Sequence, residues 1–366
     1  MAATISFARG APSLDIVDVD GLRAAADEAL AADPGGMTGY GTSVGYVPLR
    51  EWIAQRHGVT TSQVLVTNGS MQADAFLFDA LVAPGDAVVV ELPTYDRTLL
   101  SLRNRGADVR MVALEPDGID TAALERVLAT GADPTLAHII PNFQNPAGYT
   151  LSGPKRERLI ELARAHGFTI FEDDPYVALR FAGETLPTMV SMAPDVTVYA
   201  SSFSKTVCPG IRVGYLVGPE ALIAEIARRA TSTYISPNMI AQGIVNQFCR
   251  SGRIERSIET VREALRVRAE TLCGALAEHL PDARFVAPQG GYFLWVDLPS
   301  GTDVAAMADA AADRGVQFVK GTDFVLEGGG SSLRLAYSGV TPAQIEEGVG
   351  ILAEAYAQAG APAQAA

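Results

Sequence analysis

Hydrophobic runs and helix-like segments alternate along the chain from about residue 64 to residue 217. Several runs are continuous stretches of Val and Ile without polar alternation, which is typical of strands covered on both faces of a sheet. The segments between them have helical periodicity; residues 152–166 place aliphatic side chains on one face, and Gly167 follows where a C-cap belongs. Strands that alternate with helices predict a mostly parallel α/β sheet. The predicted strands are Val64–Thr67, Ala87–Glu91, Val109–Ala113, Ala137–Pro141, Thr169–Glu172, Val196–Ser201 and Ile211–Val217.

The pattern changes after residue 235, where a long helical region runs from about Ser236 to Leu280. Short hydrophobic runs and a further helix follow, and a final helix is predicted from about Pro342 to Ala357. This arrangement is typical of a smaller α+β domain. The tail after about residue 357 is rich in Ala, Gly, Pro and Gln and is predicted to be disordered. The elements predicted between the two long helices are strands over Arg284–Val286, Tyr292–Asp297, Val316–Val319 and Leu333–Ala336, and a helix over Asp303–Arg314.

The length and charge of the chain narrow the classes of function. At roughly 150 residues per domain, 366 residues indicate two domains, or one large domain with an appendage. The 28 Lys and Arg residues are outnumbered by 42 Asp and Glu residues, so the formal net charge is −14. Binding to duplex nucleic acid requires clustered positive charge that neutralises phosphates, and a basic membrane-surface role requires the same. We therefore expect neither a nucleic-acid nor a membrane partner.

The three cysteines, Cys208, Cys249 and Cys273, lack both CxxC spacing and the spacing of a disulfide framework. The chain begins without the basic segment and apolar core of a secretory signal. No apolar run reaches the ~18 residues of a transmembrane helix, and the four histidines show no metal-ligand spacing. We therefore expect a cytoplasmic protein with reduced cysteines and without a metal site.

The strongest local signal for chemistry is the segment SSFSK at residues 201–205, at the end of a predicted strand. The amine of Lys205 is suited to form an imine there. The serines beside it, together with Arg212 seven residues further on, are suited to hold a phosphate group. The alternative interpretation is a surface loop with a solvated lysine, and the segment alone does not decide between the two.

Three further polar segments follow predicted strands. Residues 172–176 (EDDPY) place acidic groups at the carboxyl end of a strand, where open α/β sheets bind ligands, although an acidic turn or helix cap is the alternative. Residues 141–148 (PNFQNPAG) also fit plain turn chemistry. Residues 67–71 (TNGSM) join a strand to a helix whose free backbone amides favour an anion, a common kind of junction. Together and in this order, the four segments are far more specific than any one of them.

With GYG at residues 39–41, PTY at 93–95 and LRL at 333–335, the four segments give the chain a resemblance to a known family. The chain resembles the fold type I enzymes that use pyridoxal 5′-phosphate (PLP), specifically the class I/II aminotransferase family. The resemblance extends from about Phe7 to Tyr356. It implies a large domain with a mostly parallel seven-stranded sheet flanked by helices, and a smaller α+β domain.

The resemblance also implies how the chain divides. We expect an N-terminal segment over residues 1–36 that packs with the small domain, a large PLP-binding domain over residues 37–245, and a C-terminal small domain over residues 246–366. The family resemblance further implies a homodimer, in which Tyr40 matches a tyrosine that reaches the cofactor phosphate of the neighbouring subunit.

The family's motifs imply roles for residues around the cofactor ring. Lys205 matches the lysine that forms the Schiff base with PLP and then moves a proton at the substrate. Asp173, three residues before Tyr176, matches the carboxylate that pairs with the ring nitrogen. Asp174 is the competing candidate, but the spacing to the tyrosine favours Asp173. Tyr176 and Asn145 match the pair that hydrogen-bonds the phenolic oxygen of the cofactor.

The remaining roles concern the ring face, the substrate and the phosphate. Tyr95 matches the aromatic residue stacked on the cofactor ring. Arg334 matches the arginine that binds the substrate α-carboxylate through its planar fork. Two further residues complete the implied substrate site. They are Asn145 and Gly10, and Gly10 belongs to the N-terminal segment that passes over the substrate. The implied phosphate ligands are Gly69, Ser70, Met71, Ser202, Ser204 and Arg212.

The resemblance implies a PLP-dependent aminotransferase that moves an amino group between an α-amino acid and a 2-oxo acid through a Schiff base on Lys205. The alternative on the same scaffold is another PLP reaction, namely β-elimination at a carbon–sulfur bond or a decarboxylating or oxidative deamination, because these reactions share the lysine and the cofactor contacts. Ligand sensing by the aminotransferase-like part of a DNA-binding regulator is a function of a different class. The net charge of −14 and the lack of room for a helix-turn-helix before residue 5 disfavour it.

Overall fold

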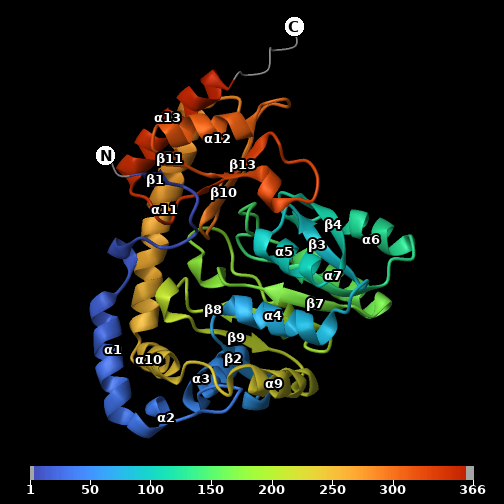
Figure 1. The fold of residues 1–366 in the computed structure, drawn as a ribbon, viewed down its shortest axis with the longest axis vertical. Helices are drawn as coiled ribbons and strands as arrows, with labels where there is room; N and C mark the ends of the chain where they lie inside the picture. The colour runs from blue at the N-terminus through green and yellow to red at the C-terminus, as the bar shows by residue number, and fades with distance from the viewer. Residues whose placement is uncertain (1–3, 360–366) are drawn as a thin grey trace.

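The computed structural model describes residues 4–359 and is built around an eight-stranded sheet (Figure 1). The strand order is β2-β9-β8-β7-β6-β3-β4-β5, in which β9 and β5 run antiparallel to their neighbours and the other neighbouring pairs are parallel. Residues 360–366, which make up most of the tail predicted to be disordered, lie outside the described residues. The strands are β2 (Val64–Thr67), β3 (Ala87–Leu92), β4 (Asp108–Glu115), β5 (Gly118–Ile119), β6 (Pro134–Ile139), β7 (Thr169–Asp173), β8 (Thr197–Ser202) and β9 (Gly214–Val217).

All seven predicted strands are present, but the sheet contains one strand more than the predicted seven. The additional strand, β5, has only two residues and pairs with the end of β4, so its hydrophobic run is too short to be recognised in the sequence. The strand predicted over residues 211–217 begins later, at Gly214. Residues 209–211 form a 3₁₀ turn instead, and Arg212 adopts a left-handed backbone conformation with φ of 49°. The predicted mostly parallel α/β fold is confirmed.

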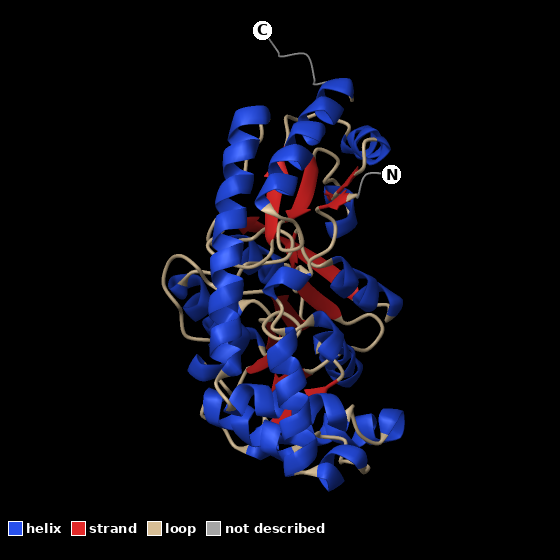
Figure 2. Ribbon diagram, turned by 90° about the vertical axis from the view of Figure 1, so that its left-hand side faces the viewer, coloured by secondary structure: helices blue, strands red, loops and turns tan. Residues whose placement is uncertain are grey.

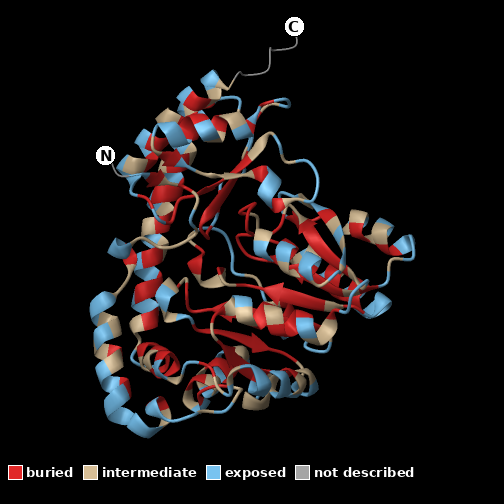
Figure 3. Cartoon of the chain, in the orientation of Figure 1, coloured by how far each residue is buried: buried red, intermediate tan, exposed pale blue. Residues whose placement is uncertain are grey.

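Alternate strand residues pack against helices on opposite faces of the sheet. Leu65 and Leu216 belong to the core under α4, α5 and α9, whereas Val64 and Val217 face α3 and α10. Helices α6, α7 and α8 cover the neighbouring part of that second face. Figure 2 shows strands between helices, and Figure 3 shows the strands as a buried layer. The helices of this part of the chain are α1 (Val19–Ala32), α2 (Pro34–Thr38), α3 (Val47–His57), α4 (Ser70–Leu81), α5 (Asp96–Asn104), α6 (Thr121–Ala129), α7 (Gly153–His166), α8 (Met189–Met192), α9 (Glu220–Tyr234) and α10 (Met239–Arg250).

A smaller unit contains an antiparallel sheet of order β10-β13-β12, with three helices packed around it. In Figure 1, its longest helix, α11, runs from the region of the large sheet to the small sheet. The N-terminal strand β1 (Ile5–Ser6) pairs with β11 (Val316–Gln317), so the first described residues lie against this unit. Its other elements are α11 (Arg253–His279), β10 (Phe293–Asp297), α12 (Val304–Asp313), β12 (Val319–Lys320), β13 (Ser332–Ala336) and α13 (Pro342–Gln358).

This part of the chain differs from the sequence prediction in three places. The helical region over residues 236–280 consists of two helices, because Gly252 lies between α10 and α11 with φ of 73°. The strand predicted over residues 316–319 is divided between β11 and β12, which pair with different strands. Residues 284–286 form only an isolated bridge to β10. The residue boundaries between the domains remain predictions.

The fold gathers the polar segments of the sequence at one edge of the large sheet. Parallel strands have their carboxyl ends at the same edge, where open α/β sheets bind ligands. Residues 141–148 follow β6, residues 172–176 begin at the end of β7, and residues 201–205 begin at the end of β8. Residues 67–71 lead from β2 into α4. In the small unit, β13 carries Arg334 to the same place.

Candidate active site

A cavity of about 150 Å³ lies where β7 and β8 end, and we call it the strand-end cavity. Its walls come from all four polar segments that the sequence analysis identified, so the fold joins segments that are far apart in the chain. The candidate residues that line it are Ser70, Met71, Tyr95, Asn145, Asp173, Tyr176, Ser202, Ser204, Lys205 and Arg212.

A second cavity, of about 390 Å³, adjoins the first and contains Arg334; we call it the Arg334 cavity. Gly10 also lines it, and a side chain at this position would collide with the ring of Phe293. The candidate substrate residues and the candidate cofactor residues therefore occupy adjoining spaces. The residues that line both cavities are Tyr95, Asn145, Tyr176 and Lys205.

Lys205 lies at the junction of the two cavities, and its Nζ donates a hydrogen bond to the backbone oxygen of Gly10 at 2.8 Å. The ring centres of Tyr176 and Tyr292 lie 5.5 Å and 5.1 Å from this nitrogen. Burial, together with the positive charges of two nearby arginines, lowers the pKa of Lys205 to about 8. A neutral amine that can accept a proton is therefore accessible near neutral pH.

One end of the strand-end cavity carries groups that donate hydrogen bonds to an anion. Gly69 has φ of 85°, which L side chains rarely adopt, and a Cβ there would displace the guanidinium of Arg212 that packs on it. Arg212 donates to Oγ of Ser204 at 3.4 Å, and Ser202 donates to the same oxygen at 2.9 Å. Helix α4 begins at Ser70, so unpaired backbone N–H groups and the positive end of the helix dipole lie at this wall. The arrangement suits a phosphate group.

The two adjacent aspartates of the EDDPY segment have different surroundings. Asp173 lines the strand-end cavity; its Oδ1 has no partner among the described residues, and its Oδ2 lies 3.4 Å from Nε2 of His138. Asp174 is fully buried, and both of its carboxylate oxygens accept hydrogen bonds from Nδ2 of Asn142 at 3.0 Å. Asp173 therefore presents a carboxylate to the cavity, whereas the carboxylate of Asp174 is already bonded within the protein.

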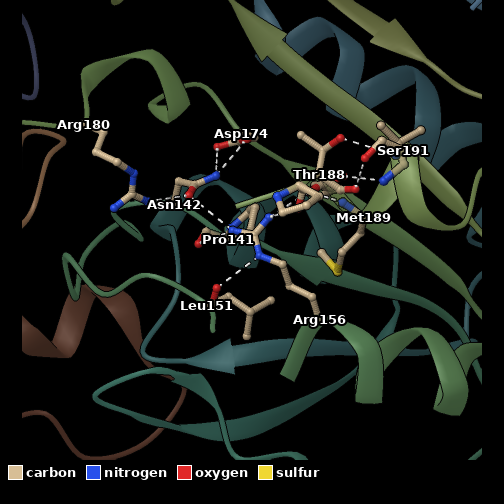
Figure 4. Close-up of polar contacts among 12 residues, drawn as sticks. Pro141, Asn142, Leu151, Arg156, Asp174, Arg180, Thr188, Met189 and Ser191 are labelled. Atoms are coloured by element: carbon tan, nitrogen blue, oxygen red, sulfur yellow. Dashed lines mark hydrogen bonds and ion pairs between the residues drawn. The ribbon is translucent and has the colours of Figure 1, made fainter. Parts of the chain in front are cut away.

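Asp174 belongs to a buried polar network, drawn in Figure 4. Arg156 of α7 has no exposed surface and donates to three backbone oxygens and to Oδ1 of Asn142. Arg180 donates to the same Asn142 oxygen at 3.1 Å. Charges can be buried at tolerable cost only when they are bonded in this way. The network ties residues 141–148, the loop that carries Asn145, to the end of β7.

Arg334 lies on β13 between the rings of Phe293 and Phe324, 4.3 Å and 4.8 Å from their centres. Its Nη1 donates to Oδ1 of Asn145 at 2.8 Å, and its Nη2 donates to the backbone oxygen of Ala8 at 2.7 Å. Its buried Nε has no partner among the described residues. Stacking and two hydrogen bonds thus fix the guanidinium, while further N–H groups remain for a planar anion such as a carboxylate.

The two tyrosines shared by the cavities remain hydrogen-bond donors. Burial raises the pKa of Tyr95 to about 12 and also raises the pKa of Tyr176. Both hydroxyls therefore keep their protons at neutral pH. The Tyr95 hydroxyl lies 3.8 Å from the sulfur of Met71, so the start of α5 contacts the first turn of α4 at this wall of the cavity.

Tyr40 is not brought to the site within this chain. The residue is 90% exposed, and it lines neither cavity. The sequence analysis in turn missed three acidic residues of the site. Asp74 follows Ser70 by one helical turn, a spacing that could have indicated it. Asp96 and Asp323 line the Arg334 cavity, but they come from different units of the fold and share no pattern in the sequence.

Within residues 4–359, no cluster of His, Cys, Asp and Glu residues has the arrangement of a metal site. None of the described helices is both long and apolar enough to cross a membrane. The three cysteines are free thiols.

Comparison with known proteins gives the site its context. Residues 4–352 match the family model for aminotransferase class I and II. The chain is 31% identical over 363 residues to aromatic-amino-acid aminotransferase 1 of Thermococcus litoralis, covering 96% of this chain and 87% of the relative. It is 33% identical over 352 residues to 2-aminoadipate transaminase of Thermus thermophilus, covering 94% and 88%.

Two solved structures agree with these relatives. The α-aminoadipate aminotransferase of Thermus thermophilus, complexed with N-(5′-phosphopyridoxyl)-L-leucine, superposes with a TM-score of 0.92 at 30% identity, and the match covers 97% of this chain and 92% of that one. The kynurenine aminotransferase of Pyrococcus horikoshii gives the same TM-score and identity over 98% of this chain and 92% of that one. The chain therefore belongs to the class I and II aminotransferase family of PLP-dependent enzymes.

Proposed function

We propose that this aminotransferase exchanges the amino group of an α-amino acid for the oxo group of a 2-oxo acid at the junction of its two cavities. The observation that carries the proposal is the amine of Lys205, which lies between a cavity with anion donors and a cavity with a fixed guanidinium. When bound, PLP supplies an aldehyde that reacts with amines and a ring that delocalises the electron pair released at the substrate α-carbon.

The residues of the strand-end cavity fit PLP. The N–H groups at the start of α4, the two serine hydroxyls and Arg212 would hold the phosphate, and the absence of a Cβ at Gly69 leaves room for Arg212 to do so. The unpartnered Oδ1 of Asp173 is suited to a protonated ring nitrogen. Tyr176 and Asn145 would donate to the phenolic oxygen, and Tyr95 would lie against the ring.

Lys205 carries the proton in the proposed mechanism. Its Nζ, once neutral, accepts the proton from the substrate α-carbon and later donates it back. The lowered pKa of Lys205 makes this neutral form available, and the hydrogen bond to the Gly10 oxygen holds Nζ at the junction of the cavities. Arg334 binds the substrate α-carboxylate, which orients the α-carbon toward Lys205.

The Arg334 cavity supports a substrate with a large side chain. Its volume of about 390 Å³ leaves room beyond the carboxylate anchor, and its lining combines aromatic rings, such as that of Phe293, with charged side chains, such as those of Asp96 and Arg97. The relatives are named for aromatic amino acids and for 2-aminoadipate. We therefore propose that the amino donor is an amino acid with a large side chain.

This part of the proposal predicts the order of donors. With one saturating 2-oxo acid, kcat/KM for tyrosine or 2-aminoadipate should exceed that for alanine about tenfold or more, because each additional buried group adds binding free energy in the transition state. Steady-state rates with these three donors measure the ratio. A clear preference for alanine would contradict the proposed large donor while leaving the transfer reaction itself in place.

We propose that the active unit is a homodimer in which Tyr40 reaches the phosphate end of the partner's strand-end cavity. Hydrogen bonds from the end of α9 and the start of α10 hold the loop after Tyr40 and the loop before α4 side by side. Exposed hydrophobic side chains gather on these segments, and a two-fold interface would cover them in both copies. Besides Tyr40, they are Met71, Ile235 and Ile240.

An active site shared between subunits predicts that two inactive variants complement each other in hybrid dimers. Tyr40→Ala and Lys205→Ala should each be nearly inactive, but hybrid dimers contain one site with Lys205 from one subunit and Tyr40 from the other. After subunit exchange at equal amounts, about a quarter of all sites should be intact, so about a quarter of wild-type activity should return. Mass spectrometry of the intact dimers measures the exchange. Wild type mixed with Lys205→Ala, whose activity should not change on exchange, shows that a Lys205→Ala subunit does not disturb its neighbour's site. Activity equal to the sum of the separate variants would show that Tyr40 does not serve the neighbouring site.

The proposal includes a cytoplasmic location. It is supported by the three free thiols of Cys208, Cys249 and Cys273, because thiols persist in reducing compartments.

A further inference from the structure

The strand-end cavity contains a second buried carboxyl group besides Asp173. Asp74 lies on α4, one helical turn after Ser70, and lines the same cavity as Asp173 and Lys205. Its residue surface is 8% exposed, and its Oδ1 has no hydrogen-bond partner among the described residues. The Oδ1 of Asp173 is likewise without a partner, at 5% exposure. Buried carboxyl oxygens without partners cost folding free energy and therefore require an explanation.

The packing of α4 on the sheet turns Asp74 toward the end of β7. Phe78, one turn further along the same helix face, packs with its ring centre 6.3 Å from that of His138 and 5.8 Å from that of Phe171. Residues four apart lie on one face of a helix, so Asp74 faces the strand ends, where Asp173 is the last residue of β7. The two carboxyl groups interact electrostatically: burial, and then the charge of Asp173, raise the pKa of Asp74 well above its ordinary value.

Several elements contribute charged and titratable groups that face Asp74 and Asp173. Within residues 4–359, neither Asp74 nor Asp173 forms an ion pair with a lysine or an arginine. The nearest titratable contact of Asp173 is His138, on β6. The other facing groups are Glu91 of β3, Tyr95 at the start of α5, and Tyr176, Lys205 and Arg212 across the cavity. The end of the cavity that contains the two aspartates thus has an excess of acidic groups.

We propose that Asp74 and Asp173 act together as a carboxyl pair that holds the ring nitrogen of PLP protonated. This inference rests on the proposed role of Asp173. A protonated ring nitrogen beside Asp173 offsets the charge of that carboxylate, and Asp74 then releases its proton to solvent. The site gains a second negative charge near the ring, and PLP binding becomes coupled to the release of a proton from Asp74. Asp74 is thus a positioning residue, whose negative charge adds to that of Asp173 and favours the protonated ring nitrogen.

The test follows the ring nitrogen directly. Wild type and variants are loaded with PLP that carries ¹⁵N in the ring, and the ¹⁵N chemical shift is recorded against pH. Asp74→Asn should let the ring nitrogen lose its proton at a pH about one unit lower than in wild type, since a nearby opposite charge shifts a pKa by about one unit or more. Asp173→Asn should lower that pH further. Asp79→Asn, which removes an exposed carboxylate from the same helix, should leave the titration unchanged.

The variants separate this inference from the function on which it rests. If Asp173→Asn shifts the titration and Asp74→Asn does not, Asp74 has no part in holding the proton, and the pair is overturned while the role of Asp173 stands. If neither variant shifts it, the proposed role of Asp173 fails, and the pair fails with it. Asp74→Ser removes the same carboxyl group with a smaller side chain and supplies the same readout if the Asn variant does not fold. The affinity of the apoprotein for PLP should lose its proton-linked pH dependence in both Asp74 variants.

Discussion

Replacing Lys205 by alanine should nearly abolish amino-group transfer, with a loss of about 10⁴-fold in kcat/KM. Lys205 supplies the amine at the junction of the strand-end and Arg334 cavities, and no neighbouring lysine can replace it. The chain has only two other lysines, and one of them, Lys155, is paired with Glu115 and Asp117. The rate at which product forms from an amino donor and a 2-oxo acid measures the loss.

The same residue predicts how PLP becomes attached. The amine attacks a carbonyl carbon only in its neutral form. Because the pKa of Lys205 is lowered to about 8, it is mostly protonated below pH 8 and mostly neutral above it. The rate at which the apoprotein acquires the visible band of bound PLP should therefore rise with pH through about 8. Borohydride reduction followed by peptide mass spectrometry should place the cofactor on Lys205.

Lys320→Ala is the matched control for Lys205, since it removes a half-buried lysine of the small unit that lines neither cavity. This variant should keep the activity and the visible band of wild type. Full turnover in Lys205→Ala, or a reduced cofactor found on Lys320, would contradict the proposed mechanism.

Replacing Arg334 by leucine should lower kcat/KM for amino acids about 1,000-fold. Its guanidinium is fixed between two phenylalanine rings and bonded to Asn145, and removing one partner of a buried ion pair costs about 3–5 kcal/mol. Arg334→Lys should lose about tenfold to 100-fold, because an ammonium keeps the charge but not the planar fork. The visible band of bound PLP should stay nearly unchanged in both variants, since Arg334 does not line the strand-end cavity.

Substrates with and without a carboxylate test the proposed role of Arg334. A primary amine without a carboxyl group should react with wild type and with Arg334→Leu at similar, low rates. Arg103→Leu, which removes an exposed arginine of α5, should behave as wild type. Unchanged amino-acid kinetics in Arg334→Leu would mean that another group binds the substrate carboxylate.

Much of the fold could be predicted from the sequence because hydrophobicity and strand position are linked. The buried strands of a sheet covered on both faces form continuous Val and Ile runs, and the residues that follow them must meet at one edge. Lys205, Asp173 and Asn145 each follow such a run, so their convergence could be expected, and the structure places all three in one cavity. The choice between Asp173 and Asp174 rested on the spacing to Tyr176, and the buried network around Asn142 supplies a physical reason for it.

What could not be predicted depends on contacts between distant segments. Asp96 becomes a neighbour of Arg334 and Asp323 only when the small unit packs against the start of α5. Asp74 looks like an ordinary polar position of an amphipathic helix until α4 is packed on the sheet. The division of residues 316–319 between two pairings also arises from tertiary structure, because β1 comes from the opposite end of the chain. The proposed role of Tyr40 depends on a second copy of the chain.

The most direct test of the proposed reaction is a single turnover of PLP-loaded protein with an amino acid and no acceptor. We expect one equivalent of 2-oxo acid per active site, with loss of the visible band and no further product. Adding a 2-oxo acid should restore the band and release the corresponding amino acid, as expected for alternating half-reactions. Continued release of pyruvate and ammonia, of a decarboxylated product or of an oxygen-dependent product, with the band intact, would contradict amino-group transfer as the main reaction of this site.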